Sequence, residues 1–240
     1  MTIHYDPLPD STASSARPVA RPGRGHLLPV LQDSTAARHG LYRSGLKRVF
    51  DILLVGLTAP LVVLVVAVLA IGTALDGGNP FYCQDRVGRG GRIYRMWKLR
   101  TMVAGAEAKL ETYLAQHPAA RQEWDSTQKL KSDPRVTRFG RFLRRSSLDE
   151  LPQLWNVLTG DMSLVGPRPM MPCQQDLYPG TAYYELRPGI TGTWQVSRRN
   201  ESSFAERAHF DQGYDRSLSL ATDLRLLIRT VRVVLNATGY

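Results

Sequence analysis

The sequence contains few of the residues that bind metals through nitrogen or sulfur. It has two cysteines, Cys83 and Cys173, and five histidines in a chain of 240 residues. The cysteines do not form a CxxC pair, and no histidine lies in an HExxH motif, so we expect no zinc site. Two isolated cysteines are typical of free thiols in a reducing compartment.

Glycine-rich nucleotide-binding loops are also missing. The glycines Gly88, Gly90 and Gly91 fit neither GxGxxG nor GxxxxGK[ST], which excludes a dinucleotide-binding motif and a P-loop. The formal net charge of +10 indicates an anionic partner, which is a nucleic acid, a phosphorylated ligand or an anionic lipid. The arginine clusters lack interleaved aromatic residues, and no helix-turn-helix or zinc-finger pattern occurs, so nucleic acid is not expected.

The first 40 residues have almost no aromatic side chains and contain five prolines. Such a segment cannot bury enough apolar surface to offset the conformational entropy lost on ordering. We therefore predict that residues 1–40 are a disordered N-terminal tail. They do not resemble a secretory signal, because the first long apolar run begins only after residue 51.

That apolar run, Ile52–Leu75, has 24 residues and no charge. About 20 apolar residues cross a bilayer core as a helix, so residues 41–76 are predicted to anchor the chain in a membrane. A buried core helix is the alternative. Basic residues flank the run on both sides, and the positive-inside rule keeps such flanks in the cytoplasm. These flanking residues are Arg38, Arg43, Lys47 and Arg48 before the run, and Arg86, Arg89, Arg92, Arg95, Lys98 and Arg100 after it.

One straight helix cannot place both flanks on the same side of the membrane, whereas a helix that bends and returns can. Pro60 supplies a break within the run, because proline lacks an N–H and clashes with the preceding turn. The pattern therefore favours a re-entrant helix, with a spanning helix kinked at Pro60 as the alternative.

The remainder of the chain, residues 77–240, predicts a small domain of mixed secondary structure. Phe81–Arg86 and Ile93–Leu99 flank a glycine-rich tip and predict a β-hairpin. Residues 104–117 predict a polar amphipathic helix. Residues 129–145 and the C-terminal segment around 224–235 predict basic amphipathic helices, which suit either a membrane surface or a core contact. The fold class is therefore α+β, with a re-entrant membrane helix and a small cytoplasmic domain.

Asp149 and Glu150 precede the apolar segment LPQLWNVL. Because proline is tolerated in the first turn of a helix, Pro152 predicts a helix start near residue 148 or 149, with Asp149 at or beside the N-cap. Acidic residues at a helix start commonly act as caps only. Here Arg144 and Arg145 lie close by, and such a site keeps carboxylates ionised. An ionised Asp can attack phosphorus, and a neighbouring carboxylate can hold Mg²⁺.

A second candidate site is the segment Pro167-Arg168-Pro169. Two prolines restrict the backbone on both sides of one arginine, which leaves that side chain little entropy to lose on binding. Arginine is well suited to bidentate contact with phosphate. A stiff surface turn is the alternative interpretation.

Five segments, in order, together resemble the bacterial sugar transferases, the polyprenyl-phosphate phosphoglycosyl transferases that begin glycan synthesis. They cover about residues 46–240. The matching segments are Lys47–Asp51, Trp97–Met102, Arg145–Leu154, Gly160–Pro169 and Arg187–Gly192.

The resemblance implies a monotopic enzyme on the cytoplasmic face of the bacterial inner membrane. Asp149 would attack the sugar-linked phosphate of a UDP-sugar, expel UMP and pass the sugar phosphate to undecaprenyl phosphate. Glu150, together with Asp149, would bind Mg²⁺. The implied substrate contacts are Lys98, Arg100, Arg144, Arg145, Pro167, Arg168 and Pro169, and the implied membrane or lipid residues are Lys47, Arg48, Asp51 and Pro60. The implied partners are membrane lipids and downstream glycosyltransferases, with a homodimer as one option.

Three features depart from the family pattern. Ala59 replaces the serine that many members carry before the helix-breaking proline, which removes a hydroxyl at the bend. Arg198 stands where a glycine is frequent. The chain also lacks the multi-span N-terminal region of longer members, so it resembles the short exopolysaccharide-initiating type that loads galactose or glucose. The alternative function is a non-catalytic basic membrane adaptor.

Overall fold

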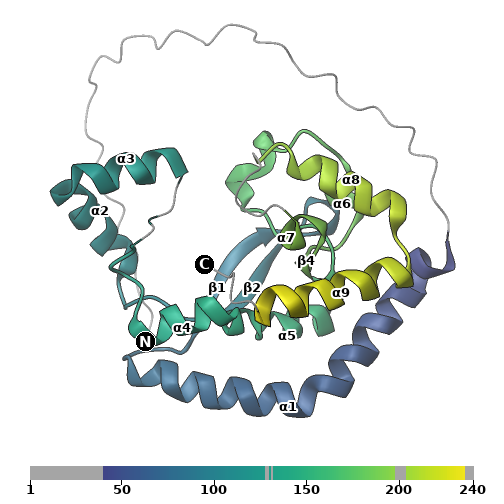
Figure 1. Cartoon of the computed structure of the whole chain (residues 1–240), viewed down its shortest axis with the longest axis horizontal. Helices are drawn as coiled ribbons and strands as arrows, with labels where there is room; N and C mark the ends of the chain where they lie inside the picture. The colour runs from purple at the N-terminus through teal and green to yellow at the C-terminus, as the bar shows by residue number, and fades with distance from the viewer. Residues whose placement is uncertain (1–39, 128–129, 131, 198–203, 236–240) are drawn as a thin grey trace, which may run out of the picture. The chain divides into compact units, whose positions relative to one another are not determined.

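The computed structural model describes residues 40–127, 130, 132–197 and 204–235 (Figure 1). These residues all belong to one compact unit, Asp33–Tyr240. The tail predicted for residues 1–40 lies, apart from Gly40, outside the described residues, as does Arg198.

A long N-terminal helix carries the apolar run. A π-helical turn, η1 (Tyr42–Leu46), leads directly into α1 (Lys47–Leu75). Within the described part of the chain, the stretch Tyr42–Leu75 is the one helix long and apolar enough to cross a membrane. With 29 residues, α1 is about 43 Å long at 1.5 Å per residue.

In Figure 1, α1 bends partway along its length, and Pro60 lies inside the helix. A proline in a helix interior removes one backbone hydrogen bond and pushes the preceding turn away, which is a common cause of such bends. The hydroxyl of Thr58 donates to the carbonyl oxygens of Leu54 and Val55, at 2.9 and 3.2 Å. Thr58 therefore places a hydroxyl beside the break, although Ala59 itself has none.

The predicted hairpin is confirmed. Strands β1 (Phe81–Val87) and β2 (Ile93–Leu99) pair antiparallel, with Phe81 opposite Leu99 and Val87 opposite Ile93. The turn between them, η2 (Arg89–Gly91), has Gly90 and Gly91 at positive φ, where glycine is favoured. The free edge of β2 is bonded to a side chain: the Asn156 amide accepts from the Trp97 N–H and donates to the Arg95 carbonyl.

Three helices follow the hairpin: α2 (Ala106–Gln116), α3 (Pro118–Thr127) and α4 (Arg138–Ser146). The predicted polar helix at 104–117 is thus confirmed as α2. The basic helix predicted for residues 129–145 begins later, at Arg138, because Thr137 caps it by accepting from the Gly140 N–H. Val136 precedes the helix and forms a β-bridge with Met102.

A short parallel sheet holds the loop that contains Arg168. It pairs β3 (Ser163–Val165) with β4 (Gly189–Thr191), and α5 (Gln153–Thr159) precedes β3. A Cβ atom on Gly166 would lie 2.2 Å from the Arg187 carbonyl oxygen, and one on Gly189 would lie 2.1 Å from the Gly166 nitrogen. Glycine is therefore required at both positions for the two segments to approach.

The remaining elements cover the sheet and close the core. They are η4 (Pro172–Leu177), α6 (Ala182–Glu185), α7 (Thr193–Val196), α8 (Arg207–Ser217) and α9 (Leu220–Leu235). The predicted C-terminal helix is confirmed as α9. Its exposed stripe contains Leu224, Ile228 and Val231, which are 43%, 56% and 58% exposed, while Leu226 is buried. Core packing therefore does not explain that stripe.

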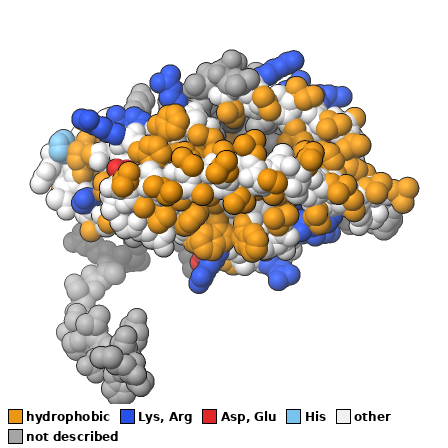
Figure 2. All heavy atoms as spheres, turned by 90° about the horizontal axis from the view of Figure 1, so that it is seen from below, with side chains coloured by type: hydrophobic (Ala, Val, Ile, Leu, Met, Phe, Trp, Pro, Cys, Tyr) orange, Lys and Arg blue, Asp and Glu red, His pale blue; other side chains and the backbone are white. Residues whose placement is uncertain are grey.

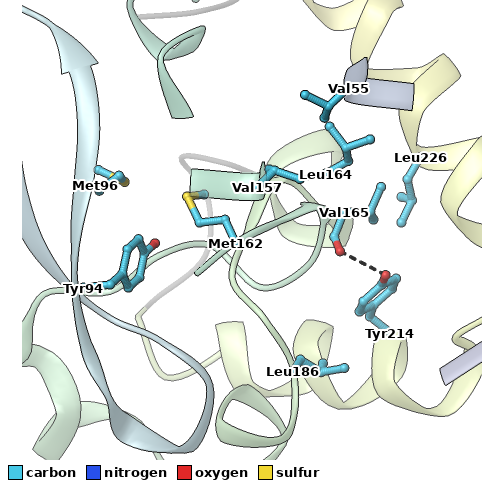
Figure 3. Packing of buried hydrophobic residues seen from close by; sticks show 10 residues of the cluster. All are labelled: Val55, Tyr94, Met96, Val157, Met162, Leu164, Val165, Leu186, Tyr214 and Leu226. Atoms are coloured by element: carbon cyan, nitrogen blue, oxygen red, sulfur yellow. Dashed lines mark hydrogen bonds between the residues drawn. The ribbon is translucent and has the colours of Figure 1, made fainter. Parts of the chain in front are cut away.

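The main core joins the membrane helix to the rest of the domain. Val55 of α1 packs with Leu164 and Val165 of β3 and with Leu226 of α9. Figure 3 shows this cluster, in which the hydroxyl oxygen of Tyr214 lies 3.2 Å from the carbonyl oxygen of Val165. A second cluster contains Val87, Met170, Tyr178 and Tyr183. Because Val55 belongs to the main core, α1 is a structural part of the domain.

Viewed from below, the molecule presents a broad hydrophobic surface with basic side chains around it (Figure 2). More of the large exposed apolar side chains belong to α1 than to any other element, and others lie on α4, α5 and α9. Trp155 of α5 is 60% exposed and Phe142 of α4 is 53% exposed. Apolar exposure on this scale marks a surface that contacts lipid or a partner.

Candidate active site

The acidic pair lies in a tight turn between two helices. Ser147 ends α4 in the left-handed region at φ 57°, and η3 (Leu148–Glu150) follows as a turn of 3₁₀ helix. We expected a helix start at 148 or 149, which is wrong: α5 begins at Gln153 and Pro152 is its N-cap. Because Pro152 has no N–H, it cannot donate to Leu148, and α-helical bonding begins only after it.

The turn directs both carboxylates toward Lys98 on β2. The Lys98 ammonium donates to Glu150 Oε1 at 2.8 Å and lies 3.9 Å from Asp149 Oδ2. Asp149 is buried, with 8% of the residue exposed. Residues as far as 52 positions apart are thus brought into one charged group, and contact of Lys98 with phosphate stays a prediction.

Burial changes the acidity of Asp149. The pKa of this carboxyl is raised to about 6, chiefly by burial; the charges of Lys98 and Arg144 lower the pKa, and the charge of Glu150 raises it. We expected the basic neighbours to hold the pKa low, but desolvation outweighs them because it penalises the charged form directly. The carboxyl is still largely ionised at neutral pH.

Arg144 completes this group from α4. Its Nε donates to the Thr101 hydroxyl at 2.8 Å, and its positive charge lowers the pKa of Asp149. Gly140 allows the close approach of α4, because a Cβ atom there would lie 2.1 Å from the Thr101 carbonyl oxygen. The guanidinium is therefore fixed beside the carboxylates before any substrate arrives.

Contact of Arg145 and Arg100 with substrate stays a prediction. Arg145 is exposed on α4. Arg100 donates through Nη2 to the Thr73 carbonyl at 3.1 Å, near the C-terminus of α1. The same carbonyl also accepts from the Asp76 N–H at 3.2 Å, so Arg100 adds a second donor at this end of α1. In this structure it ties the membrane helix to β2.

The loop Pro167–Pro169 presents Arg168 to solvent. The Pro167 carbonyl accepts from the Gly189 N–H at 2.8 Å, and the Met170 carbonyl accepts from the Val87 N–H at 3.0 Å. The Tyr183 hydroxyl accepts from the Met170 N–H and donates to the Val87 carbonyl. Arg168 itself is exposed and lies over the Trp194 ring at 5.5 Å. The loop is thus held on both sides, while the arginine remains accessible.

The predicted membrane residues have partners inside the protein. Lys47 donates to Asp223 at 2.6 Å, and Arg48 donates to the carbonyls of Val157 and Leu158 at the end of α5. Asp51 accepts from the Ser163 hydroxyl at 2.7 Å and from the Leu164 N–H at 3.2 Å. Contact of Lys47 and Arg48 with lipid phosphates stays a prediction, since their hydrogen bonds here serve the fold.

The acidic pair fits a divalent cation in its chemistry. The negative charge of Glu150 raises the pKa of Asp149, and a bound cation would relieve that repulsion. Among the described residues no group of three or more His, Cys, Asp or Glu side chains forms a metal cluster. Mg²⁺ does not require one, because it binds through one or two carboxylates plus water and substrate phosphates.

Sequence reasoning missed several residues that shape the site. Thr101 and Asn156 position Arg144 and β2, and Tyr183 holds the Arg168 loop. Thr101 belongs to the segment Trp97–Met102 that was already singled out, so its polar side chain was the available signal. The role of Tyr183 depends on contacts with residues 13 and 96 positions away, which no local pattern reveals.

Comparison with known proteins places these features in context. The profile described as bacterial sugar transferase matches residues 42–237. A UDP-galactose-lipid carrier transferase of Erwinia amylovora is 47% identical over 81% of the chain and 41% of its own length. An undecaprenyl-phosphate galactose phosphotransferase of Salmonella typhimurium is 42% identical over 87% of the chain and 44% of its length. Both relatives are therefore more than twice as long as the segment they share with this chain.

A shorter relative is matched over most of its length. The exopolysaccharide production protein ExoY of Sinorhizobium fredii is 42% identical over 80% of the chain and 87% of its own length. All of the acidic-turn and Pro-Arg-Pro residues lie within the part of the chain that the profile matches.

Proposed function

Because the chain belongs to the bacterial sugar transferase family, we propose that it transfers a hexose-1-phosphate from a UDP-sugar to undecaprenyl phosphate and releases UMP. The observation that carries the proposal is the buried Asp149, whose carboxylate lies beside Lys98, Glu150 and Arg144. A carboxylate held among cations at the surface of a membrane-associated fold suits attack on a phosphate that is itself anionic.

The reaction has two displacement steps at one phosphorus atom. An Asp149 oxygen forms a bond to the sugar-linked phosphorus, and the bond from that phosphorus to the bridging oxygen breaks. The bridging oxygen leaves with UMP. An oxygen of undecaprenyl phosphate then attacks the same phosphorus, the bond to Asp149 breaks, and the carboxylate is regenerated. Neither step requires a proton from the protein.

Lys98 and Arg144 would support both steps electrostatically. Their positive charges lower the pKa of Asp149 and so favour its ionised form. The same charges would attract the diphosphate of the donor and oppose charge build-up on the oxygens around phosphorus. Hydrogen bonds from Lys98 to Glu150 and from Arg144 to Thr101 orient these groups in advance.

Glu150 and Asp149 would hold Mg²⁺, which, when bound, supplies neutralisation of the charge on the departing nucleotide. Arg168 would bind the donor diphosphate from its exposed position in the loop. The sugar is proposed to be galactose or glucose, and the product would enter exopolysaccharide synthesis, where downstream glycosyltransferases use it. Homodimer formation stays a prediction.

The membrane path of α1 is proposed to be re-entrant, so that the chain is monotopic on the cytoplasmic face of the inner membrane. Three observations support this path: basic residues flank both ends of α1, the helix bends, and Pro60 lies inside it. Labelling of cysteines introduced at residues 44 and 78 from outside intact cells is expected to fail at both. Labelling at one position only would indicate a spanning helix.

The function is tested by measuring UMP release from a panel of UDP-sugars by the purified full chain in nanodiscs containing undecaprenyl phosphate and Mg²⁺. We expect release with UDP-galactose or UDP-glucose, and dependence on the lipid for multiple turnovers. Turnover of a different nucleotide donor only would indicate another phosphotransferase. No turnover with any donor would favour the membrane adaptor.

A further inference from the structure

Two arginines from distant parts of the sequence lie against Trp194, and a third arginine interacts electrostatically with both of them. Arg168 follows β3 and lies 5.5 Å from the centre of the Trp194 ring. Arg207, the first residue of α8, lies between two aromatic rings, 4.4 Å from Trp194 and 4.6 Å from Phe204. Arg86 lies on β1 and interacts electrostatically with both. The charge of Arg168 lowers the pKa of Arg86, and the charge of Arg86 lowers the pKa of Arg207. We call Arg86, Arg168 and Arg207 the arginine cluster.

The cluster carries positive charge that the protein does not neutralise. In the part of the chain that the structure describes, none of the three guanidiniums forms a salt bridge. The negative charge of Asp211 raises the pKa of Arg207. The carboxylate of Asp211 already accepts a hydrogen bond from the Tyr178 hydroxyl at 2.8 Å. Burial, followed by the charge of Arg168, lowers the pKa of Arg207 to about 10. Gathering like charges in this way opposes folding unless a counter-charge binds.

Arg86 also has an unused donor. Its Nη2 donates to the Gln84 side chain, but its Nε is buried and has no hydrogen-bond partner among the described residues. A buried donor without a partner costs free energy, about 1–3 kcal/mol, that an external acceptor would recover. An anion with several acceptor oxygens would both accept from the Arg86 Nε and neutralise the positive charge of the three arginines.

We infer that the arginine cluster is a phosphate-binding site, in which Arg86 and Arg207 join Arg168 to hold a phosphate group of a substrate. A planar guanidinium pairs with two phosphate oxygens at once, and Trp194 and Phe204 fix the orientation of Arg207 by stacking. The inference rests on the proposed function and extends it to two residues outside the Pro-Arg-Pro segment.

The hairpin connects this cluster to the acidic pair. Tyr82, Gln84 and Arg86 alternate onto one face of β1, and Tyr82 is opposite Lys98 on β2. The four residue steps from Tyr82 to Arg86 span about 13 Å at roughly 3.3 Å per step. A ligand that has two charged parts can therefore contact Lys98 near one end of this face and the cluster near the other. The phosphate is either in the nucleotide diphosphate or on the lipid acceptor.

Binding measurements on the full chain in nanodiscs test the inference without requiring turnover. The variants are Arg86→Gln and Arg207→Gln, with Arg86→Lys and Arg207→Lys as milder changes in case a glutamine disturbs folding. The control is Arg225→Gln, which removes the same charge from an exposed position on α9. UDP is titrated in one arm and a short-chain prenyl phosphate in the other, and thermal unfolding confirms that each variant is folded.

We expect both glutamine variants to raise the dissociation constant about tenfold or more in one arm, because each removes charge-assisted hydrogen bonds to phosphate. Weakening in the UDP arm assigns the cluster to the donor, and weakening in the prenyl phosphate arm assigns it to the acceptor. Equal affinities for wild type and folded variants in both arms would overturn the inference, as would the same loss in Arg225→Gln.

The outcome is separable from that of the proposed function. If wild type turns over no UDP-sugar but binds UDP, and both variants lose that binding, the phosphate site is supported and the proposed reaction is contradicted. If both variants turn over a UDP-sugar at the wild-type rate at limiting substrate, the proposed reaction is supported and the phosphate site is contradicted.

Discussion

The ammonium group of Lys47, at the start of α1, lies 2.6 Å from the carboxylate of Asp223 on α9. Asp223 is completely buried and also accepts hydrogen bonds from the hydroxyls of Tyr42 and Tyr214, both at 2.7 Å. Three donors around one carboxylate satisfy a charge that would otherwise be costly to bury. The membrane helix and the C-terminal helix therefore share one buried ion pair.

Lys47→Met should destabilise the fold by about 3–5 kcal/mol, because it leaves the buried Asp223 carboxylate without its counter-charge. Thermal unfolding in detergent measures the effect, with Lys109→Met on the exposed face of α2 as the control. If Lys47 instead served only lipid phosphates, unfolding would be unchanged and affinity for the polyprenyl phosphate alone would fall.

Asp149→Asn should reduce UMP release by about 10⁴-fold or more, which is typical of removing a nucleophile. Intact-protein mass spectrometry should show a phosphosugar adduct with wild type and none with Asp149→Asn, while the unfolding temperature of the variant stays close to that of wild type. Asp85→Asn, an exposed position on β1, is the matched control. Wild-type formation of lipid product by Asp149→Asn would show that another group attacks phosphorus.

Tyr183→Phe should weaken the hold on the Arg168 loop, because it removes the hydroxyl that bonds both Met170 and Val87. We expect a stability loss of about 1–3 kcal/mol and a raised KM for the UDP-sugar with a smaller change in kcat. Tyr184→Phe, beside it in α6, provides the control. A drop in stability with an unaltered KM would limit Tyr183 to a structural role.

Stability should depend on pH through Asp211. Burial raises the pKa of this carboxyl to about 7, from about 4 in the unfolded chain, so the folded state binds the proton more tightly. The stabilisation is fully present below about pH 4 and is lost as pH rises to about 7, up to about 4 kcal/mol in all. The unfolding temperature of wild type should therefore fall between about pH 4 and 7 relative to that of Asp211→Asn, and the difference should stay constant above that range. Parallel pH profiles for the two proteins would contradict this.

Local patterns in the sequence predicted the elements that local interactions determine. The alternation around Gly88–Gly91 predicted the hairpin, and the uncharged run Ile52–Leu75 predicted the long apolar helix. The start of α5 was misplaced, because Pro152 was assigned to the first turn of a helix that begins one residue after it. The left-handed backbone conformation of Ser147 could not be predicted, because serine has no preference for positive φ.

The partners of the basic residues could not be predicted in the same way. Lys47, Arg48 and Arg100 were all expected near phosphates, whereas their hydrogen bonds go to Asp223, to the end of α5 and to Thr73. Each of these contacts joins residues 27 to 176 positions apart. Lys98 and Asp149, which also depend on tertiary folding, were placed together by resemblance to the family rather than by a local pattern.

The burial of Asp51 against Ser163 and Leu164 bears on how this protein can be handled in the laboratory. Deleting the hydrophobic helix to obtain a water-soluble fragment would remove the carboxylate that accepts from the Ser163 hydroxyl and the Leu164 N–H. It would also expose the part of the core against which Val55 packs. Detergent or nanodisc extraction of the intact polypeptide is therefore the route to a folded preparation, and a truncation starting at residue 77 should precipitate.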